Sequence, residues 1–251
     1  MRPAMRVTII GCGDAFGAGG SLQTSFYVRA GSSTFLVDCG ASTLIGLRRF
    51  GLQPNDVDTL FVTHLHGDHF GGLPWLLIDA TYVSKRTRPL VVTGPRGIED
   101  RFLTVAEALY PGITGVKKDF ELTFVEYHER QPLGAGGVTV TPFEVKHPSG
   151  APPYALRFEA GGKTLAFTGD TGWVEVLCEV ARGADLFITE CFQYDVVLPI
   201  HLDYSTIDAN YRKLGAKRVL LTHMGEAMLS QIANVNRSRY LIAHDGMTLD
   251  L

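Results

Sequence analysis

Three histidines and one aspartate crowd into the segment THLHGDHFGG at residues 63–72. If His64, His66, Asp68 and His69 were buried together, they would lose hydration at a cost that requires a compensating partner. A divalent metal ion provides that compensation, because neutral imidazoles and carboxylates are its natural ligands. The segment therefore predicts a metal site, and a complete site needs ligands from elsewhere in the chain.

Six apolar, strand-like runs each end on a histidine or a carboxylate. The runs are FLV, LFVT, FEVK, LAFTG, LFIT and VLLT, and the residues that follow them are Asp38, His64, His147, Asp170, Glu190 and His223. Strands that end at one rim of a sheet would bring these groups together. His128 and His244 lie away from the polar strand ends, and we interpret them as ordinary histidines.

The elements that must position these residues form two similar halves without a linker, so we expect one domain over residues 1–251. Strands are expected over residues 5–11, 25–30, 34–40, 58–64, 89–94, 121–127, 137–147, 154–160, 163–170, 185–190 and 217–223. Helices are expected over residues 42–50, 71–83, 96–109, 172–183, 205–216 and 227–236. Ser42 is the expected N-cap of the first helix, and Ser205 or Thr206 that of the fifth. Residues 239–251 are expected to close as a hairpin.

Composition narrows the class of protein. The chain is 45% hydrophobic and 20% charged, which suits a globular protein with a substantial core. A net charge of −3 does not indicate the basic surface that binding of a long nucleic acid needs, although a local basic patch is still compatible with this charge. The four cysteines form no CxxC pair, and we expect free thiols, no signal peptide and a cytoplasmic location. No apolar run approaches the length of a membrane span.

The motif HLHGDH, followed by His147, Asp170 and His223, resembles the metallo-β-lactamase-fold superfamily of hydrolases. The resemblance covers positions 38–223 in the family's order. It implies an α/β (α+β) fold of four layers, an αβ/βα sandwich, with the active site at one edge of the two sheets.

The resemblance also implies roles for individual residues. One metal would be held by His64, His66 and His147, and a second by Asp68, His69 and His223, with Asp170 bridging the two. Asp38 would orient the ligand loop by hydrogen bonds, although it could instead cap a turn before Gly40. Seven ligands for two ions leave positions open for water, as catalytic sites require. Asp68 is therefore counted among the catalytic residues as well as the ligands.

Three features indicate the branch of the superfamily. Asp170 stands where one large group of β-lactamases has cysteine. The segment TECFQYDVVLPIHLDYST resembles the late motif of the phosphodiesterase branch, which includes the tRNA 3′-processing ribonuclease Z, and Glu190 and His201 match its proton-donating pair. Only residues 148–169 separate His147 from Asp170, where the tRNA nucleases carry a long arm.

The sequence therefore predicts a phosphodiesterase that acts on a small or cyclic phosphodiester through a metal-bridging hydroxide. A lactone, carboxylic ester or thioester hydrolase is the alternative, and a non-enzymatic metal-binding regulator is a third reading. His201 could also bind phosphate, or be a plain loop histidine. Two divalent ions are expected, with zinc as the default and manganese or iron as alternatives. A small molecule is the expected partner, no membrane is expected, and a homodimer is left open.

The segment GCGDAFG at residues 11–17 imitates a dinucleotide-binding fingerprint. Its spacing is GxGxxxG, and the chain then leads into a strand rather than a helix. We therefore interpret it as a glycine-rich turn that faces the active site.

Overall fold

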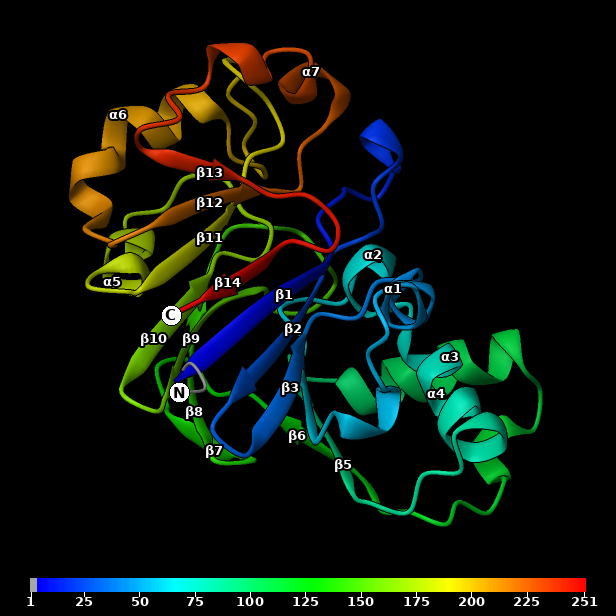
Figure 1. The fold of residues 1–251 in the computed structure, drawn as a ribbon. Helices are drawn as coiled ribbons and strands as arrows, with labels where there is room; N and C mark the ends of the chain where they lie inside the picture. The colour runs from blue at the N-terminus through cyan, green and yellow to red at the C-terminus, as the bar shows by residue number, and fades with distance from the viewer. Residues whose placement is uncertain (1–3) are drawn as a thin grey trace.

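Two seven-stranded sheets pack face to face, and helices cover both outer faces (Figure 1). This arrangement comes from a computed structural model that describes residues 4–251. It confirms the expected αβ/βα sandwich of four layers. None of the helices in this range has both the length and the apolar character that a membrane crossing needs.

The first sheet has the strand order β14-β1-β2-β3-β4-β5-β6. Strands β3 to β6 run parallel to one another, whereas β14, β1, β2 and β3 pair antiparallel. The strands are β1 (Met5–Gly11), β2 (Ser25–Ala30), β3 (Ser33–Val37), β4 (Thr59–Phe61), β5 (Leu90–Gly94), β6 (Leu122–Glu126) and β14 (Thr248–Asp250). The helices of this half are α1 (Thr43–Arg49), α2 (Gly67–Phe70), α3 (Leu73–Ile78) with a π-turn over Asp79–Val83, and α4 (Ile98–Leu109).

The second sheet has the order β13-β12-β11-β10-β9-β8-β7, and β10 to β13 are parallel. Its strands are β7 (Leu133–Ala135), β8 (Val138–Glu144), β9 (Tyr154–Ala160), β10 (Lys163–Phe167), β11 (Leu186–Glu190), β12 (Val219–Thr222) and β13 (Tyr240–Ile242). Its helices are α5 (Val176–Ala181), α6 (Tyr204–Leu214) and α7 (Glu226–Leu229). Short 3-10 turns lie at Ala18–Gly20, Pro54–Asp56, Ile113–Gly115 and Ile232–Asn234.

Alternation along the strands builds three apolar layers, because successive side chains of a strand point to opposite faces. Phe35 faces the other sheet, where its ring stacks 5.3 Å from that of Phe158, whereas Leu36 faces the helices. In the second sheet, Leu186 faces the first sheet, whereas Phe187 faces the helices of its own half. Both faces of both sheets are therefore buried, which holds the strand ends rigidly in place.

Three local expectations were wrong. Residues 239–251 do not form a hairpin, because β13 pairs with β12 in one sheet and β14 pairs with β1 in the other. The side chain that caps α6 belongs to Asp203, which accepts a hydrogen bond from the Thr206 N–H. Ser42 occupies the N-cap position of α1, but its hydroxyl accepts from the Gln23 N–H instead of capping the helix.

Candidate metal centre

The predicted ligands meet where the carboxyl ends of strands from both sheets converge. On the side of the first sheet, His64 follows β4, His66 occupies the N-cap position of α2, and Asp68 and His69 lie within α2. The second sheet supplies the remaining ligands at the ends of β8, β10 and β12, which are His147, Asp170 and His223. The polar residues that follow the strands therefore lie close together, as the strand-end pattern predicted, but they come from both sheets rather than from one.

His64, His66 and His147 form one group whose ligating atoms all lie within 4.8 Å of one another. Nε2 of His147 lies 3.0 Å from Nδ1 of His66. The ring of His64 lies 4.8 Å from that of His66 and 4.9 Å from that of His147. Three imidazoles that point at one position are a set typical of zinc and related ions.

Asp68, His69, Asp170 and His223 form a second group, and all four are buried. Asp68 Oδ2 lies 3.3 Å from His69 Nε2 and 3.2 Å from His223 Nε2. Two imidazoles and two carboxylates at these separations could hold a second divalent ion.

Asp170 lies between the two groups. Its Oδ1 lies 3.2 Å from His69 Nε2, and its Oδ2 lies 3.3 Å from His223 Nε2. The same Oδ2 lies 3.9 Å from Nε2 of His64 and of His147 in the first group. This placement is the one that a bridging carboxylate requires.

Asp38 and Thr63 orient two of the candidate ligands, His64 and His69, through hydrogen bonds. The carboxylate of Asp38 accepts hydrogen bonds from the Thr63 N–H at 2.7 Å and from the Thr63 hydroxyl at 2.9 Å, and its Oδ2 lies 2.6 Å from His69 Nδ1. Thr63 Oγ1 also lies 3.1 Å from His64 Nδ1. These contacts engage the Nδ1 atoms and leave Nε2 for an ion, which is how outer partners orient ligating histidines.

Two residues of the site have left-handed backbone conformations. Asp38 has φ 59° and His223 has φ 54°, a region that non-glycine residues seldom occupy. The His223 N–H donates to the Cys12 carbonyl at 2.8 Å, and the Asp38 N–H donates to the Phe61 carbonyl at 2.8 Å. The surrounding backbone therefore holds both side chains in place against a local cost.

The residues fit divalent metal ions. Nε2 of His64, Nε2 of His69 and Oδ1 of Asp170 are buried and have no hydrogen-bond partner within residues 4–251, although buried polar atoms normally have one. Burial lowers the pKa of His69, but Asp170, Asp38 and Asp68 outweigh it and raise that pKa well above its ordinary value. Positive charge is thus favoured at this position, and a bound cation would provide it.

Glu190 and His201 form a pair beside the ligands. His201 Nδ1 lies 3.1 Å from Oε2 and 3.2 Å from Oε1 of Glu190, and the His201 ring lies 4.9 Å from that of His147. Glu190 is fully buried, and its burial followed by the charge of Asp170 raises its pKa well above the ordinary value. His201 is partly exposed, and its Nδ1 is the nitrogen that faces Glu190.

Sequence reasoning missed several residues that shape the centre. Thr63 holds both His64 and Asp38, the Ile200 carbonyl lies 2.9 Å from His147 Nδ1, and the ring of Phe192 lies 4.8 Å from that of His201. One signal could have revealed Thr63, because a threonine precedes the polar residue in the runs VTH, ITE and LTH. A backbone carbonyl such as that of Ile200 leaves no mark in the sequence.

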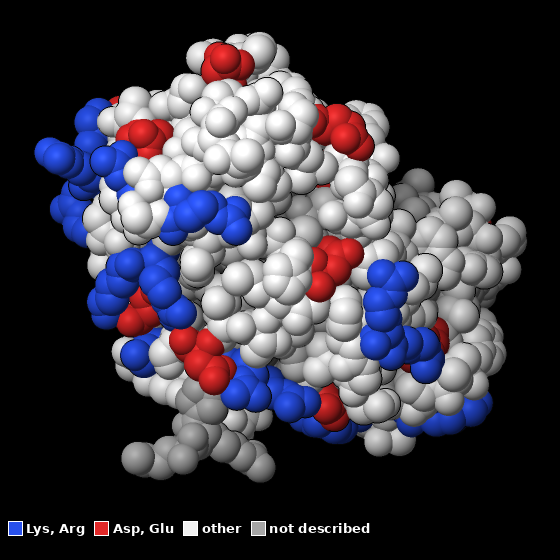
Figure 2. Space-filling view, turned by 45° about the horizontal axis from the view of Figure 1, so that its top comes forward, with Lys and Arg blue, Asp and Glu red and all other residues white. Residues whose placement is uncertain are grey.

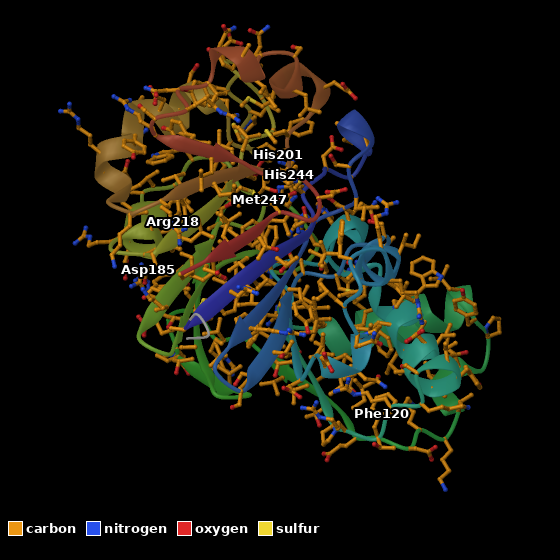
Figure 3. The ribbon with its side chains drawn as sticks, viewed as in Figure 1. Phe120, Asp185, His201, Arg218, His244 and Met247 are labelled. Atoms are coloured by element: carbon orange, nitrogen blue, oxygen red, sulfur yellow. The ribbon has the colours of Figure 1, made fainter. Side chains whose placement is uncertain are left out.

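The remaining segments singled out from the sequence lie where they were expected. His128 and His244 are exposed and belong to none of the clusters described above. The turn at residues 11–17 touches the centre through the Cys12 carbonyl and leads to β2 without an α-helix. Figure 3 labels His201 and His244, and the His201 ring lies 5.9 Å from that of His223.

A family model described as "Anti-Pycsar protein Apyc1" matches residues 5–246 of the chain. The probable metallo-hydrolase YhfI of Bacillus subtilis is 27% identical over 88% of this chain and 87% of its own length. Its crystal structure superposes with a TM-score of 0.77 at 25% identity and covers 98% of this chain and 99% of that one.

Two further relatives span most of the chain. Ribonuclease Z of Geobacillus kaustophilus is 29% identical over 80% of this chain and 82% of its own length. The uncharacterized protein Rv1339 of Mycobacterium tuberculosis is 31% identical over 88% of this chain and 81% of its own length. The residues matched by the family model, 5–246, include the positions of all seven candidate ligands.

Proposed function

Because the chain belongs to the family described by the anti-Pycsar protein Apyc1, and to the metallo-hydrolases of the metallo-β-lactamase fold, we propose that it is a dinuclear metal-dependent phosphodiesterase. Its substrate is a small or cyclic phosphodiester. The observation that supports this proposal is the Glu190–His201 pair, in which the His201 imidazole lies within hydrogen-bond distance of Glu190 beside the ligand cluster.

Seven side chains would hold the two ions. His64, His66 and His147 serve one ion, Asp68, His69 and His223 serve the other, and Asp170 serves both. When bound, such ions activate water and stabilise the negative charge that develops on phosphoryl oxygens. Zinc suits this set of nitrogen and oxygen ligands, and so do manganese and iron.

His201 donates a proton to the departing oxygen. Glu190 accepts the hydrogen bond from Nδ1 and fixes the orientation of the ring, so that Nε2–H serves the substrate. An alkoxide is a poor leaving group without a proton, so a proton donor is useful where a phosphodiester expels an alkoxide. A thioester or an activated ester expels a weakly basic anion that makes a smaller demand on such a donor, so the pair favours the phosphodiesterase over these acyl substrates.

Features around the centre support a small substrate. The interval between His147 and Asp170 contains the antiparallel pair β9 and β10, joined by the turn at Gly161–Gly162. On the face drawn in Figure 2, lysine and arginine side chains gather toward the α5 and α6 side and are mixed with carboxylates. A long RNA would need a continuous basic surface.

The test compares two classes of phosphodiester in the metal-loaded protein. His201→Ala should lower kcat/KM for an alkyl phosphodiester by about 10²–10⁴-fold. It should lower the value for a nitrophenyl phosphodiester much less, because nitrophenolate leaves without a proton. Glu190→Gln should show the same pattern more weakly, and metal content should stay intact in both variants.

The exposed residue His128 provides the matched control, since His128→Ala removes an imidazole outside the site. An equal loss on both substrates in His201→Ala would mean that His201 binds phosphate or metal. Loss on neither substrate, combined with good lactone or thioester turnover, would replace the proposal with the ester hydrolase.

A further inference from the structure

A groove of about 400 Å³ opens directly beside the metal centre. Asp68 and Gly67 of the ligand loop line it at one end, and Trp75 of α3 and Val105 and Leu109 of α4 supply apolar lining. A Cβ added at Gly67 would meet no atom within 4 Å, so the groove is open next to Asp68. A molecule bound at the metals can therefore extend into this groove.

The lining suits a flat aromatic ring. Trp75 is half-buried and lines the groove. Val105 is half-buried and Leu109 is exposed, and both are apolar. A partly exposed indole is an effective stacking platform, because every aromatic base or ring has a π-face.

Gln23 adds one polar group to the groove. Its Oε1 accepts a hydrogen bond from the Ala41 N–H at 2.7 Å, which fixes the orientation of the amide. The Nε2 donors of Gln23 have no protein partner within residues 4–251. The groove thus offers an apolar face with a single polar edge, which is the pattern of a ligand pocket of about 300–1,000 Å³.

We propose that the groove binds a planar aromatic group carried by the alcohol portion of the phosphodiester, with Trp75 as its stacking platform. The placement of the phosphoryl group rests on the proposed function above. The volume of about 400 Å³ accommodates one ring system. Trp75 is then a specificity-determining residue that acts on binding of the organic group.

The test measures binding rather than turnover. Titration calorimetry on the metal-loaded protein compares phenylphosphonate with methylphosphonate, which share the headgroup and differ in the ring. The wild-type protein should bind phenylphosphonate about 10-fold more tightly. In Trp75→Ala the ratio of the two Kd values should fall to about 1–2, and Trp75→Phe should restore most of it.

Tyr82→Ala is the matched control, because Tyr82 is an exposed aromatic residue outside the groove, and it should keep the wild-type ratio. A wild-type ratio near 1, absence of binding of both phosphonates, or an unchanged ratio in Trp75→Ala would overturn the proposal. If a second copy of this chain covers the groove, Trp75→Ala would change the oligomeric state in light scattering and leave the ratio unchanged. Because phosphonates are not hydrolysed, failure of the proposed phosphodiesterase activity would be recognised separately, as absence of turnover.

Discussion

Replacing Asp38 by Asn should weaken metal binding although Asp38 touches no metal position. Asparagine has nearly the same shape and also tolerates the left-handed backbone at φ 59°, so the substitution changes charge and hydrogen bonding alone. Asp38 Oδ1 accepts from the Thr63 N–H, and Oδ2 faces the Thr63 hydroxyl and His69 Nδ1. An amide has one oxygen and cannot accept on both sides.

Either orientation of the amide carries a cost. If the oxygen replaces Oδ2, the NH₂ group faces the Thr63 N–H and two buried donors meet. If the oxygen replaces Oδ1, the NH₂ group faces His69 Nδ1 and favours the tautomer with a proton on Nε2, which cannot bind a metal. An unpaired buried donor costs about 1–3 kcal/mol. Loss of an outer partner of this kind typically reduces metal affinity by about 10–100-fold, which corresponds to about 1.4–2.7 kcal/mol.

The assay is competition for the metal against a chromophoric chelator, with thermal unfolding of the metal-free protein measured in parallel. The unfolding experiment separates the cost to the fold from the cost to the site. Asp56→Asn is the control, because Asp56 is a half-exposed aspartate that lies 3.4 Å from Arg29, away from the candidate ligands. Wild-type affinity for both ions in a folded Asp38→Asn protein would refute the orienting role of Asp38.

Three further outcomes are expected. Asp170→Ala should release both ions, because its carboxylate faces both ligand groups; metal analysis that still finds two ions per chain would contradict the bridging role. Ellman's reagent at pH 8 should label Cys178 before the three buried cysteines. Burial raises the pKa of Cys12 and of Cys39 to about 12, so both remain unreactive thiols until the protein unfolds. Rapid labelling of all four cysteines in the folded protein would contradict this. A precursor tRNA should remain uncleaved at its 3′ end at moderate ionic strength, because β9 and β10 occupy the interval between His147 and Asp170, and efficient cleavage would disprove the small-substrate proposal.

The strand-end pattern carried most of the correct prediction. Apolar runs that stop at His64, Asp170 and His223 place polar groups at the end of a sheet, and because all three are buried there, each needs a polar partner or an ion. Because neighbouring strands such as β10, β11 and β12 run parallel, their carboxyl ends lie at the same edge of the sheet, and the polar residues that follow them come close together. The αβ/βα sandwich was implied by the resemblance of the HLHGDH motif, His147, Asp170 and His223 to the metallo-β-lactamase-fold superfamily, and the structure confirms it.

What failed depended on tertiary context. The segments Tyr240–Ile242 and Thr248–Asp250 are separated by a short turn, so local rules favour a hairpin, yet each strand completes the edge of a different sheet. Asp203 was overlooked as a cap because the following Ser205 and Thr206 are equally good capping types. The left-handed backbone at His223 could not be predicted, since its cause is a hydrogen bond to Cys12, far away in the sequence.

The division of the ligands between two sheets bears on how the protein matures. One half of the chain brings His64, His66, Asp68 and His69, and the other brings the remaining three ligands, so each half by itself offers only a partial coordination set. If the proposed ions bind, their tight capture would follow docking of the two sheets and would not guide the earliest steps of folding. Bound ions would then link the two halves of the chain, and we expect their release to require the ends of the two sheets to separate, rather than one loop to open.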